Sequence, residues 1–313
     1  MATAVLIVSA VRTAIGKAPN GALRYTRPDE LAAVIMREAI ARAPGVTPGD
    51  IDDVVFGCAM PEAEQGLNVA RIAWLRAGFP VGASAVTVNR FCASSLEAIA
   101  IGANRIAAGE ADIVLAGGTE SMSMVPMMGN KIAMNPSVFA DDNVAIAYGM
   151  GITAEKVAEQ WKVSREQQDA VALQSHQRAL AAIANGEFSE EIAAYALDDH
   201  YPDLDARAIT TDSRRIDTDE GPRKDTSLEA LAKLRPVFRM GGSVTAGNSS
   251  QTSDGAGAVL LASEQALKDY NLVPLSTLRA LVLERRSSLE PQLAARHQSS
   301  GAEPVWHRMA PRV

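Results

Sequence analysis

The chain has few of the residues that mark several common classes of protein. It contains only two cysteines, Cys58 and Cys92, and four histidines in 313 residues. So few cysteines exclude a disulfide framework and a zinc-binding cysteine cluster, and they favour a reducing compartment, so we expect a cytoplasmic protein without a bound metal. The chain also lacks net positive charge, since 37 Asp and Glu outnumber 30 Lys and Arg and the net charge is −7. We therefore expect a small-molecule substrate and neither nucleic acid nor a membrane as partner.

Long hydrophobic runs are absent as well. No apolar run approaches the roughly 20 residues that a membrane-spanning helix needs. The first run, Ala4 to Ala10, has no basic stretch before it and continues into a polar turn, so we predict a buried strand there instead of a signal peptide. The chain is nevertheless 47% hydrophobic. That is enough to bury a sizeable core in one large or two ordinary domains.

Short apolar runs alternate with helical patterns along much of the chain. The runs DDVVFGCA, ADIVLAGG and GAGAVLLAS are typical of strands buried on both faces, as in a sheet covered by helices. Between such runs, DELAAVIMREAIARA and SLEAIAIGANRIAAG have the composition of helices with a large apolar face. The alternation predicts an α/β fold.

Residues 121–242 interrupt this pattern. Four closely spaced methionines are followed by a helix that Ser164 and Gln167 can cap, and then by a charged segment rich in turn residues. We interpret this region as a loop domain inserted into the sheet.

The expected domain organisation has four parts. Residues 1–120 form the first part of the main domain, 121–242 the inserted loop domain, and 243–276 the last part of the main domain. From residue 277 the arginines have no helical phase and no strand run occurs. We predict that 277–313 is a disordered tail or coding sequence read out of frame.

Cys92 lies between a strand-like run and the start of a long apolar helix, in TVNRFCASSLEAIAIG. A helix N-terminus favours negative charge and so lowers the pKa of a thiol, and the thiolate is the reactive nucleophile. Ala93, Ser94 and Ser95 are small enough to let a substrate approach. Cys92 is therefore a candidate nucleophile, although a free cysteine is also a common small hydrophobe in protein cores.

The segment around this cysteine closely resembles the nucleophile segment of thiolases, the acetyl-CoA acetyltransferases and 3-ketoacyl-CoA thiolases. Three further stretches match the same family in order, and the resemblance covers roughly residues 1 to 276. The four matching stretches are SAVRTAIGK, CAMPEAEQGLNVAR, VNRFCASSLEAIAIGANRIAAGEADIVLAGGTESMSMVP and GSVTAGNSSQTSDGAGAVLL.

The resemblance implies a thiolase-like layered fold, with a mixed, mostly parallel sheet covered by helices and a CoA-binding loop domain. It implies that Cys92 attacks an acyl-CoA or 3-ketoacyl-CoA and holds the acyl group as a thioester. The acyl group then passes to CoA or to an acetyl-CoA carbanion. CoA is thus a substrate, and no permanently bound cofactor or metal is expected.

The resemblance also suggests where CoA lies. Met150 matches the position that contacts the pantetheine arm, Arg223 lies in a stretch similar to the one near the adenine and phosphates, and Ser250 falls where the family hydrogen-bonds pantetheine. Each residue also has a simpler interpretation. Met150 could be core packing, Arg223 a solvated charge and Ser250 a turn residue.

Three segments that the resemblance leads us to expect from a second, similar half do not occur in the sequence. They are Asn-Glu-x-Phe, Gly-His-Pro with the histidine that activates the nucleophile, and Cys-x-Gly with an acid–base cysteine. We therefore expect that second half to be absent through truncation or a frameshift. Turnover should be impaired, since a positioned general base is worth roughly 10²–10⁴-fold. His297 and His307 lack the glycine-rich turn of the missing segment.

Two alternatives to a thiolase acyltransferase remain. One is a non-catalytic thiolase-like protein that binds CoA derivatives or a partner chain. The other is a condensing enzyme of the ketoacyl synthase type, which the stretches NRFCASS and TAGNSSQTSDGA disfavour. Thiolases are commonly homodimers or dimers of dimers, so the resemblance implies self-association, with the strand before Cys92 as the contact.

Overall fold

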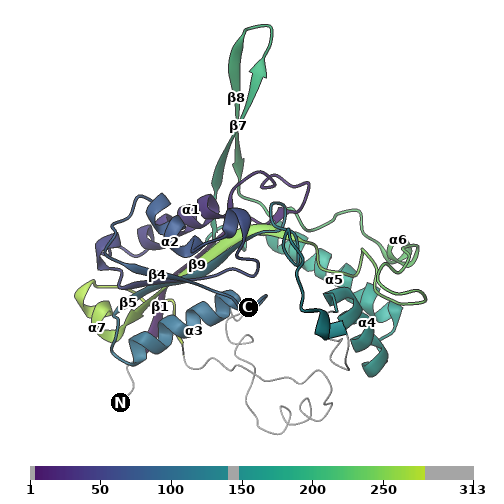
Figure 1. Ribbon diagram of the computed structural model, residues 1–313, viewed down its shortest axis with the longest axis horizontal. Coiled ribbons are helices and arrows are strands. Elements are labelled where there is room, and N and C mark those ends of the chain that lie inside the picture. The colour runs from purple at the N-terminus through teal and green to yellow at the C-terminus, as the bar shows by residue number, and fades with distance from the viewer. Residues whose placement is uncertain (1–3, 140–147, 279–313) are drawn as a thin grey trace.

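A mixed β-sheet with helices on both faces carries the fold, as the sequence predicts (Figure 1). This computed structural model describes residues 4–139 and 148–278. The strands of the sheet are β1 (Val5–Thr13), β2 (Gly16–Lys17), β3 (Asp53–Gly57), β4 (Ser84–Val88), β5 (Ile113–Ser121), β6 (Ile192–Ala193), β9 (Ser253–Ser263) and β10 (Ser276–Leu278). The main path across the sheet is β10-β1-β9-β5-β3-β4, while β2 pairs with β9 and β6 with β1.

Strand direction divides this sheet into two parts. β3 pairs in parallel with both β4 and β5. β9 runs antiparallel to both β1 and β5 and lies between them. All of residues 122–252 separate β9 from β5 along the chain. The chain therefore leaves the sheet after β5 and returns to fill its centre.

Burial follows the apolar runs seen in the sequence. All five residues of β3 are buried, and so are all but one of the nine in β5. β4 is the last strand of the sheet path and only part of it is covered, with Val86 36% exposed. One edge of the sheet is therefore open at the strand that leads to Cys92.

Helices cover both faces of the sheet. α1 and α2 lie on one face and α3 on the other, while α4 to α6 lie to one side of the sheet (Figure 1). The α-helices are α1 (Pro28–Ala41), α2 (Val69–Arg76), α3 (Ser94–Ala107), α4 (Met150–Trp161), α5 (Arg165–Ala184), α6 (Leu228–Ala232) and α7 (Glu264–Asp269). Three short 3₁₀ helices are η1 (Pro48–Asp50), η2 (Ala63–Gln65) and η3 (Pro136–Phe139).

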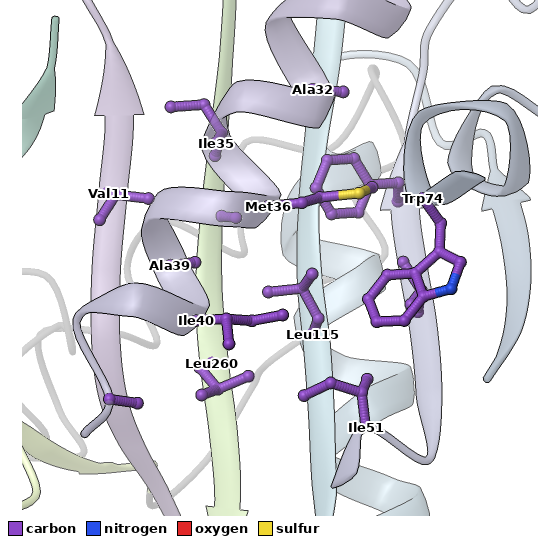
Figure 2. Packing of buried hydrophobic residues seen from close by; sticks show 14 of the residues in the cluster. Val11, Ala32, Ile35, Met36, Ala39, Ile40, Ile51, Trp74, Leu115 and Leu260 are labelled. Carbon is purple, nitrogen blue, oxygen red and sulfur yellow. The ribbon is translucent and has the colours of Figure 1, made fainter. Parts of the chain in front are cut away.

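The larger apolar core lies between α1 and the sheet (Figure 2). Pro28 starts α1 at a position where a missing backbone N–H costs no helical hydrogen bond. Trp74 of α2 closes one end of this core, and its ring nitrogen donates a 2.6 Å hydrogen bond to the carbonyl oxygen of Pro80. The labelled members are Val11, Ala32, Ile35, Met36, Ala39, Ile40, Ile51, Trp74, Leu115 and Leu260.

The opposite face of the sheet carries a smaller core under α3. Ala98 and Ile106 of α3 pack with Val55 of β3 and Val114 of β5. A Cβ atom on Gly102 would lie 2.8 Å from a methyl carbon of Val114. Small residues therefore let α3 lie close to the sheet.

The chain between β5 and β9 forms helices α4 to α6 and a projecting hairpin, β7 (Tyr195–Asp203) and β8 (Ala208–Ile216) (Figure 1). The predicted cap of α5 is confirmed, because the Ser164 hydroxyl accepts from the Gln167 backbone and the Gln167 side chain accepts from the Ser164 backbone. The hairpin is a correction, since its charged sequence suggested only turns. Backbone pairing from Tyr195↔Ile216 to Asp203↔Ala208 forms it, which composition does not reveal.

Arg12 of β1 ties the inserted region to the sheet. Its guanidinium donates two hydrogen bonds to Asp219, at 2.7 and 2.9 Å, and one to Glu191 at 2.6 Å. Burial alone would raise the pKa of Asp219, but the hydrogen bonds from Arg12 and from the Ile15 backbone hold that pKa below its ordinary 3.8. At pH values above 3.8, ionised Asp219 therefore stabilises the folded state. This contribution is lost as the pH falls through the lowered pKa of the folded state.

Replacing Asp219 with asparagine is expected to reduce the free energy of unfolding by about 1–3 kcal/mol near neutral pH, because two charge-assisted hydrogen bonds are lost. The difference between variant and wild type should shrink as the pH falls below 3.8. Denaturant unfolding at several pH values measures it. Asp217→Asn is the control, because Asp217 pairs with Arg215 at an exposed site and should have little effect. A difference that persists unchanged at acid pH would contradict the prediction.

The strand β10 includes the first two residues of the predicted tail. Thr277 and Leu278 pair with Leu6 and Val5 as part of β10, although the sequence placed both in the tail. The antiparallel partner strand stabilises a run that is too short to be recognised by itself. His297, His307 and all of 279–313 lie outside the described residues.

Candidate active site

Cys92 lies in the turn that joins β4 to α3, and it is exposed. The residue before it, Phe91, has a φ of 47°, which is a strained conformation for a bulky side chain. Two tight backbone hydrogen bonds follow, from Ala93 to the Arg90 carbonyl at 3.1 Å and from Ser94 to the Phe91 carbonyl at 2.9 Å. The turn therefore directs Cys92 away from the core at the start of the helix.

Two side chains hold this strained turn. Ser94 is buried, and its hydroxyl accepts from the Arg90 backbone at 2.8 Å and donates to the Phe91 carbonyl at 2.5 Å. The Asn89 side chain accepts from the Phe91 backbone N–H at 2.8 Å. The Ser94 bond to the Phe91 carbonyl and the Asn89 bond to the Phe91 N–H both hold Phe91, so they offset the cost of its positive φ.

Glycines let α3 begin directly on the ends of β3 and β5. A Cβ atom on Gly57 would lie 2.5 Å from the Ser95 backbone nitrogen and 2.7 Å from Cβ of Ser94. One on Gly118, which pairs with Gly57 in the sheet, would lie 2.8 Å from the Gly57 carbonyl oxygen. Real Cβ atoms do not approach so closely. The two glycines thus set where the helix starts and, with it, where Cys92 lies.

The first turn of α3 is open to a ligand. Its N-cap residue, Ala93, makes no side-chain cap, and the N–H of Cys92 donates to no acceptor within the described residues. Unpaired N–H groups at a helix N-terminus favour negative charge. A negative charge at this end of α3 would therefore be stabilised.

A shallow groove of about 300 Å³ lies beside the same helix. It is lined by Ser95 and Ile99 of α3 and by segments of β1, β5 and β9, including Val11 and Gly257. Cys92 does not line it. The groove is therefore an adjoining surface of the α3 face and not a pocket around the nucleophile.

The second cysteine has a different environment. Cys58 follows β3 and is buried, as the sequence suggests. Burial raises the pKa of its thiol to about 12, and the nearby Glu120 carboxylate adds to the effect. Because only the ionised thiolate is reactive, Cys58 is unreactive at neutral pH.

In the folded protein, iodoacetamide is expected to modify Cys92 and to leave Cys58 unmodified between about pH 7 and 9, since only Cys92 is exposed and Cys58 stays protonated. Peptide mass mapping after timed labelling measures both sites. Unfolding in denaturant provides the control, because both thiols should then react. Modification of Cys58 at a rate similar to that of Cys92 in the folded protein would contradict the expected burial.

The predicted CoA contacts lie on the inserted region and on the loop before β9. Met150 is the first residue of α4 and is 60% exposed, so it is not core packing in this chain. The Arg223 guanidinium pairs with Asp225 at 2.9 Å. The Ser250 hydroxyl donates to the Gln251 carbonyl at 3.2 Å. Among the described residues, these three and Cys92 make no hydrogen bond or ion pair with one another.

Histidine 176 has a partner that the sequence did not suggest. Its Nδ1 accepts a 3.2 Å hydrogen bond from the Arg223 backbone N–H. The interaction joins α5 to the loop that carries Arg223. His176 thus makes a contact within the inserted region.

Comparison with known proteins identifies the family. Residues 5–265 match the thiolase N-terminal domain. The chain belongs to the thiolase family. It is 44% identical over 284 residues to a 3-ketoacyl-CoA thiolase of Bacillus subtilis (strain 168), with 89% of this chain and 70% of that protein covered. It is 43% identical over 281 residues to a 3-ketoacyl-CoA thiolase of Yersinia pestis (strain Pestoides F), with the same coverage.

A solved structure agrees with this assignment. The crystal structure of the Bacillus anthracis acetyl-CoA acetyltransferase has a TM-score of 0.72 and 37% identity, and covers 88% of this chain and 69% of that one. The thiolase-like fold predicted from the motifs is thereby confirmed, and this thiolase is an acyltransferase by family. The roles of Cys92, Met150, Arg223 and Ser250 stay predictions.

The thiolase site contains residues that the motifs did not single out. Gln65 donates a hydrogen bond to Glu120, and Asn89 is connected to Glu120 through Ala59, which bonds to both side chains. The polar Glu120 at the end of the apolar run ADIVLAGGTE was the one available signal. Its partners could not be identified without the pairing of β3 with β5.

The described residues lack two features that mark other classes of protein. Within residues 4–139 and 148–278, no helix combines the length and the apolar character needed to cross a bilayer. The same residues contain no group of three or more histidine, cysteine, aspartate or glutamate side chains arranged to hold a metal ion.

Proposed function

We propose that this thiolase transfers acyl groups between CoA thioesters through an acyl-cysteine on Cys92. The observation that carries the proposal is the exposed Cys92 at the uncapped start of α3, in a strained and hydrogen-bonded turn. The thiolate sulfur attacks the thioester carbonyl carbon, and the electron pair of the C=O bond moves to oxygen. The C=O bond then re-forms, the carbon–sulfur bond to CoA breaks, CoA leaves as a thiolate that takes a proton, and the acyl group stays on Cys92. With a 3-ketoacyl-CoA the sulfur attacks the 3-keto carbon instead, the bond between C2 and C3 breaks, and acetyl-CoA leaves as a carbanion that takes a proton.

The described residues support this first half-reaction in two ways. The N-terminus of α3 would stabilise the developing oxyanion, because the helix dipole and the Cys92 N–H, which donates to no acceptor among the described residues, are both present before the substrate binds. The small side chains of Ala93 and Ser95 leave room beside the sulfur. In the second half-reaction, a CoA thiolate would attack the acyl-cysteine, which is thiolytic transfer.

We infer that 3-ketoacyl-CoA or acetoacetyl-CoA is the substrate class, since the curated relatives are named 3-ketoacyl-CoA thiolases and the solved relative is an acetyl-CoA acetyltransferase. Met150, Arg223 and Ser250 are the proposed CoA contacts. Arg223 would exchange its exposed partner Asp225 for a phosphate, which costs little because surface ion pairs are weak. The open edge at β4 is the proposed contact for self-association.

Mass spectrometry tests the proposal directly. The purified chain is incubated with acetyl-CoA or acetoacetyl-CoA, quenched in acid and measured intact, and the modified peptide is then mapped. The expected result is a gain of one acetyl group on the peptide that contains Cys92, with Cys58 unmodified as the internal control. Addition of free CoA should remove the acetyl group and regenerate acetyl-CoA.

Two results would overturn the acyl-cysteine step. One is the absence of any adduct on folded protein whose Cys92 still reacts with iodoacetamide. The other is an adduct on a different residue. If CoA or acyl-CoA nevertheless binds in equilibrium dialysis, the non-catalytic CoA-binding function is the one that remains.

A further inference from the structure

A half-buried carboxylate contacts the loop that follows β3. Glu120, near the end of β5, accepts hydrogen bonds from the backbone N–H of Ala59 at 2.6 Å and of Met60 at 3.2 Å. The side chain of Gln65 also donates to it. Both carboxylate oxygens are thus used to hold one short turn, and hydrogen bonds to a charged acceptor are the stronger kind.

Gln65 closes this arrangement from the other side. It is fully buried, its amide also donates to the Met60 carbonyl at 2.9 Å, and its oxygen accepts from the Ser121 backbone at 3.0 Å. Gln65 therefore joins both the turn and β5. With it in place, the Glu120 carboxylate has little freedom to move, and neither does the Ala59 peptide.

The same turn is connected to Cys92 through one exposed side chain. The carbonyl of Ala59 accepts a 3.0 Å hydrogen bond from the Asn89 amide, and the Asn89 oxygen accepts from the Phe91 N–H at 2.8 Å. Phe91 is the strained residue that precedes Cys92. A continuous set of hydrogen bonds thus extends from Glu120 through the Ala59 peptide and Asn89 to the residue that sets the direction of Cys92.

We propose that Glu120 is a positioning residue for Cys92, acting through the Ala59 peptide and the Asn89 amide. It touches neither the sulfur nor the acyl group. The carboxylate holds the 58–60 turn, the turn orients Asn89, and Asn89 holds Phe91 in its positive-φ conformation, which keeps the sulfur at the N-terminus of α3. The consequence for acyl transfer rests on the proposed function, whereas the orientation of the thiol does not.

The test is a double-mutant cycle on the reactivity of Cys92. Glu120→Gln keeps the shape of the side chain and removes the carboxylate, and Asn89→Ala removes the connecting amide. Glu38→Gln is the control for loss of a carboxylate, since Glu38 pairs with Arg42 on α1, away from this network. Two rates are measured for each protein: alkylation of Cys92 by iodoacetamide and acetylation of Cys92 by acetyl-CoA. Circular dichroism and the thermal midpoint report whether each variant is folded.

Each single change is expected to lower both rates by about tenfold, because a displaced nucleophile loses its alignment with the helix N-terminus. The rates of the double variant should also be only about tenfold below the wild-type rates, since both changes interrupt the same connection. Glu38→Gln should leave both rates at the wild-type value. If Glu120→Gln does not fold, Glu120→Asp takes its place in the cycle, because aspartate keeps the carboxylate and only moves it away from the 58–60 turn.

Two results would overturn the proposal. One is an unchanged alkylation rate in a folded Glu120 variant. The other is a double variant slowed by roughly the product of the single effects, about a hundredfold, because independent structural effects multiply. Alkylation separates this outcome from failure of the proposed function. If acetyl-CoA does not acetylate the wild type, the alkylation cycle still tests the positioning role.

Discussion

Replacing Cys92 with serine is expected to reduce acetylation by acetyl-CoA to below detection. A hydroxyl ionises far less readily than a thiol, and the helix N-terminus alone cannot compensate without an adjacent base. The measurement is the intact mass of the variant after incubation with acetyl-CoA, with the same quench as for the wild type. Because Cys92 is exposed and its N–H donates no hydrogen bond among the described residues, the thermal midpoint should stay near that of the wild type.

The unchanged thermal midpoint is the control, because a variant that is folded and inactive locates the chemistry at the sulfur. Two outcomes would contradict the prediction. An acetyl group in the serine variant at the wild-type rate would show that another residue accepts it. An unfolded variant would show that Cys92 is structural, which its exposure argues against.

Replacing Gly57 with alanine is expected to destabilise the fold by about 3 kcal/mol, the upper end of the usual cost of overpacking a core. The new Cβ would lie 2.5 Å from the Ser95 backbone nitrogen. Neither β3, which pairs with β4 on one side and β5 on the other, nor the first turn of α3 can move without breaking its own hydrogen bonds. Denaturant unfolding measures the loss. Displacement of α3 should also slow alkylation of Cys92, because the helix start would no longer lie beside the sulfur.

Gly82→Ala is the matched control for this change. Gly82 lies in the loop before β4, and a Cβ atom there would meet nothing within 4 Å. Its alanine variant should be as stable as the wild type or slightly more so, since alanine restricts the unfolded chain. Equal effects of the two substitutions would show that the close approach of Gly57 to α3 does not limit packing.

The strands and helices near Cys92 could be predicted because each has a local signal. The continuous apolar runs correspond to β3, β5 and β9, and the apolar segment after Cys92 is α3. The cap at Ser164 was predictable for the same reason, because a capping box needs only residues three positions apart. The hairpin of β7 and β8 was missed, because cross-strand pairing supplies most of what stabilises it.

The features of the candidate site also fall into those that the sequence predicts and those that only the structure shows. By itself the sequence determined that a cysteine stands at the start of an apolar helix and that its surroundings resemble a thiolase, since both features lie within one stretch of chain. Only the tertiary structure decided that hydrogen bonds connect Glu120 and Gln65, through Ala59, to Asn89 and Phe91 beside that cysteine. This connection depends on the parallel pairing of β3 with β5 and β4, which brings three strand ends to one edge of the sheet. Sheet order is a property of how whole strands pack, and no local pattern encodes it.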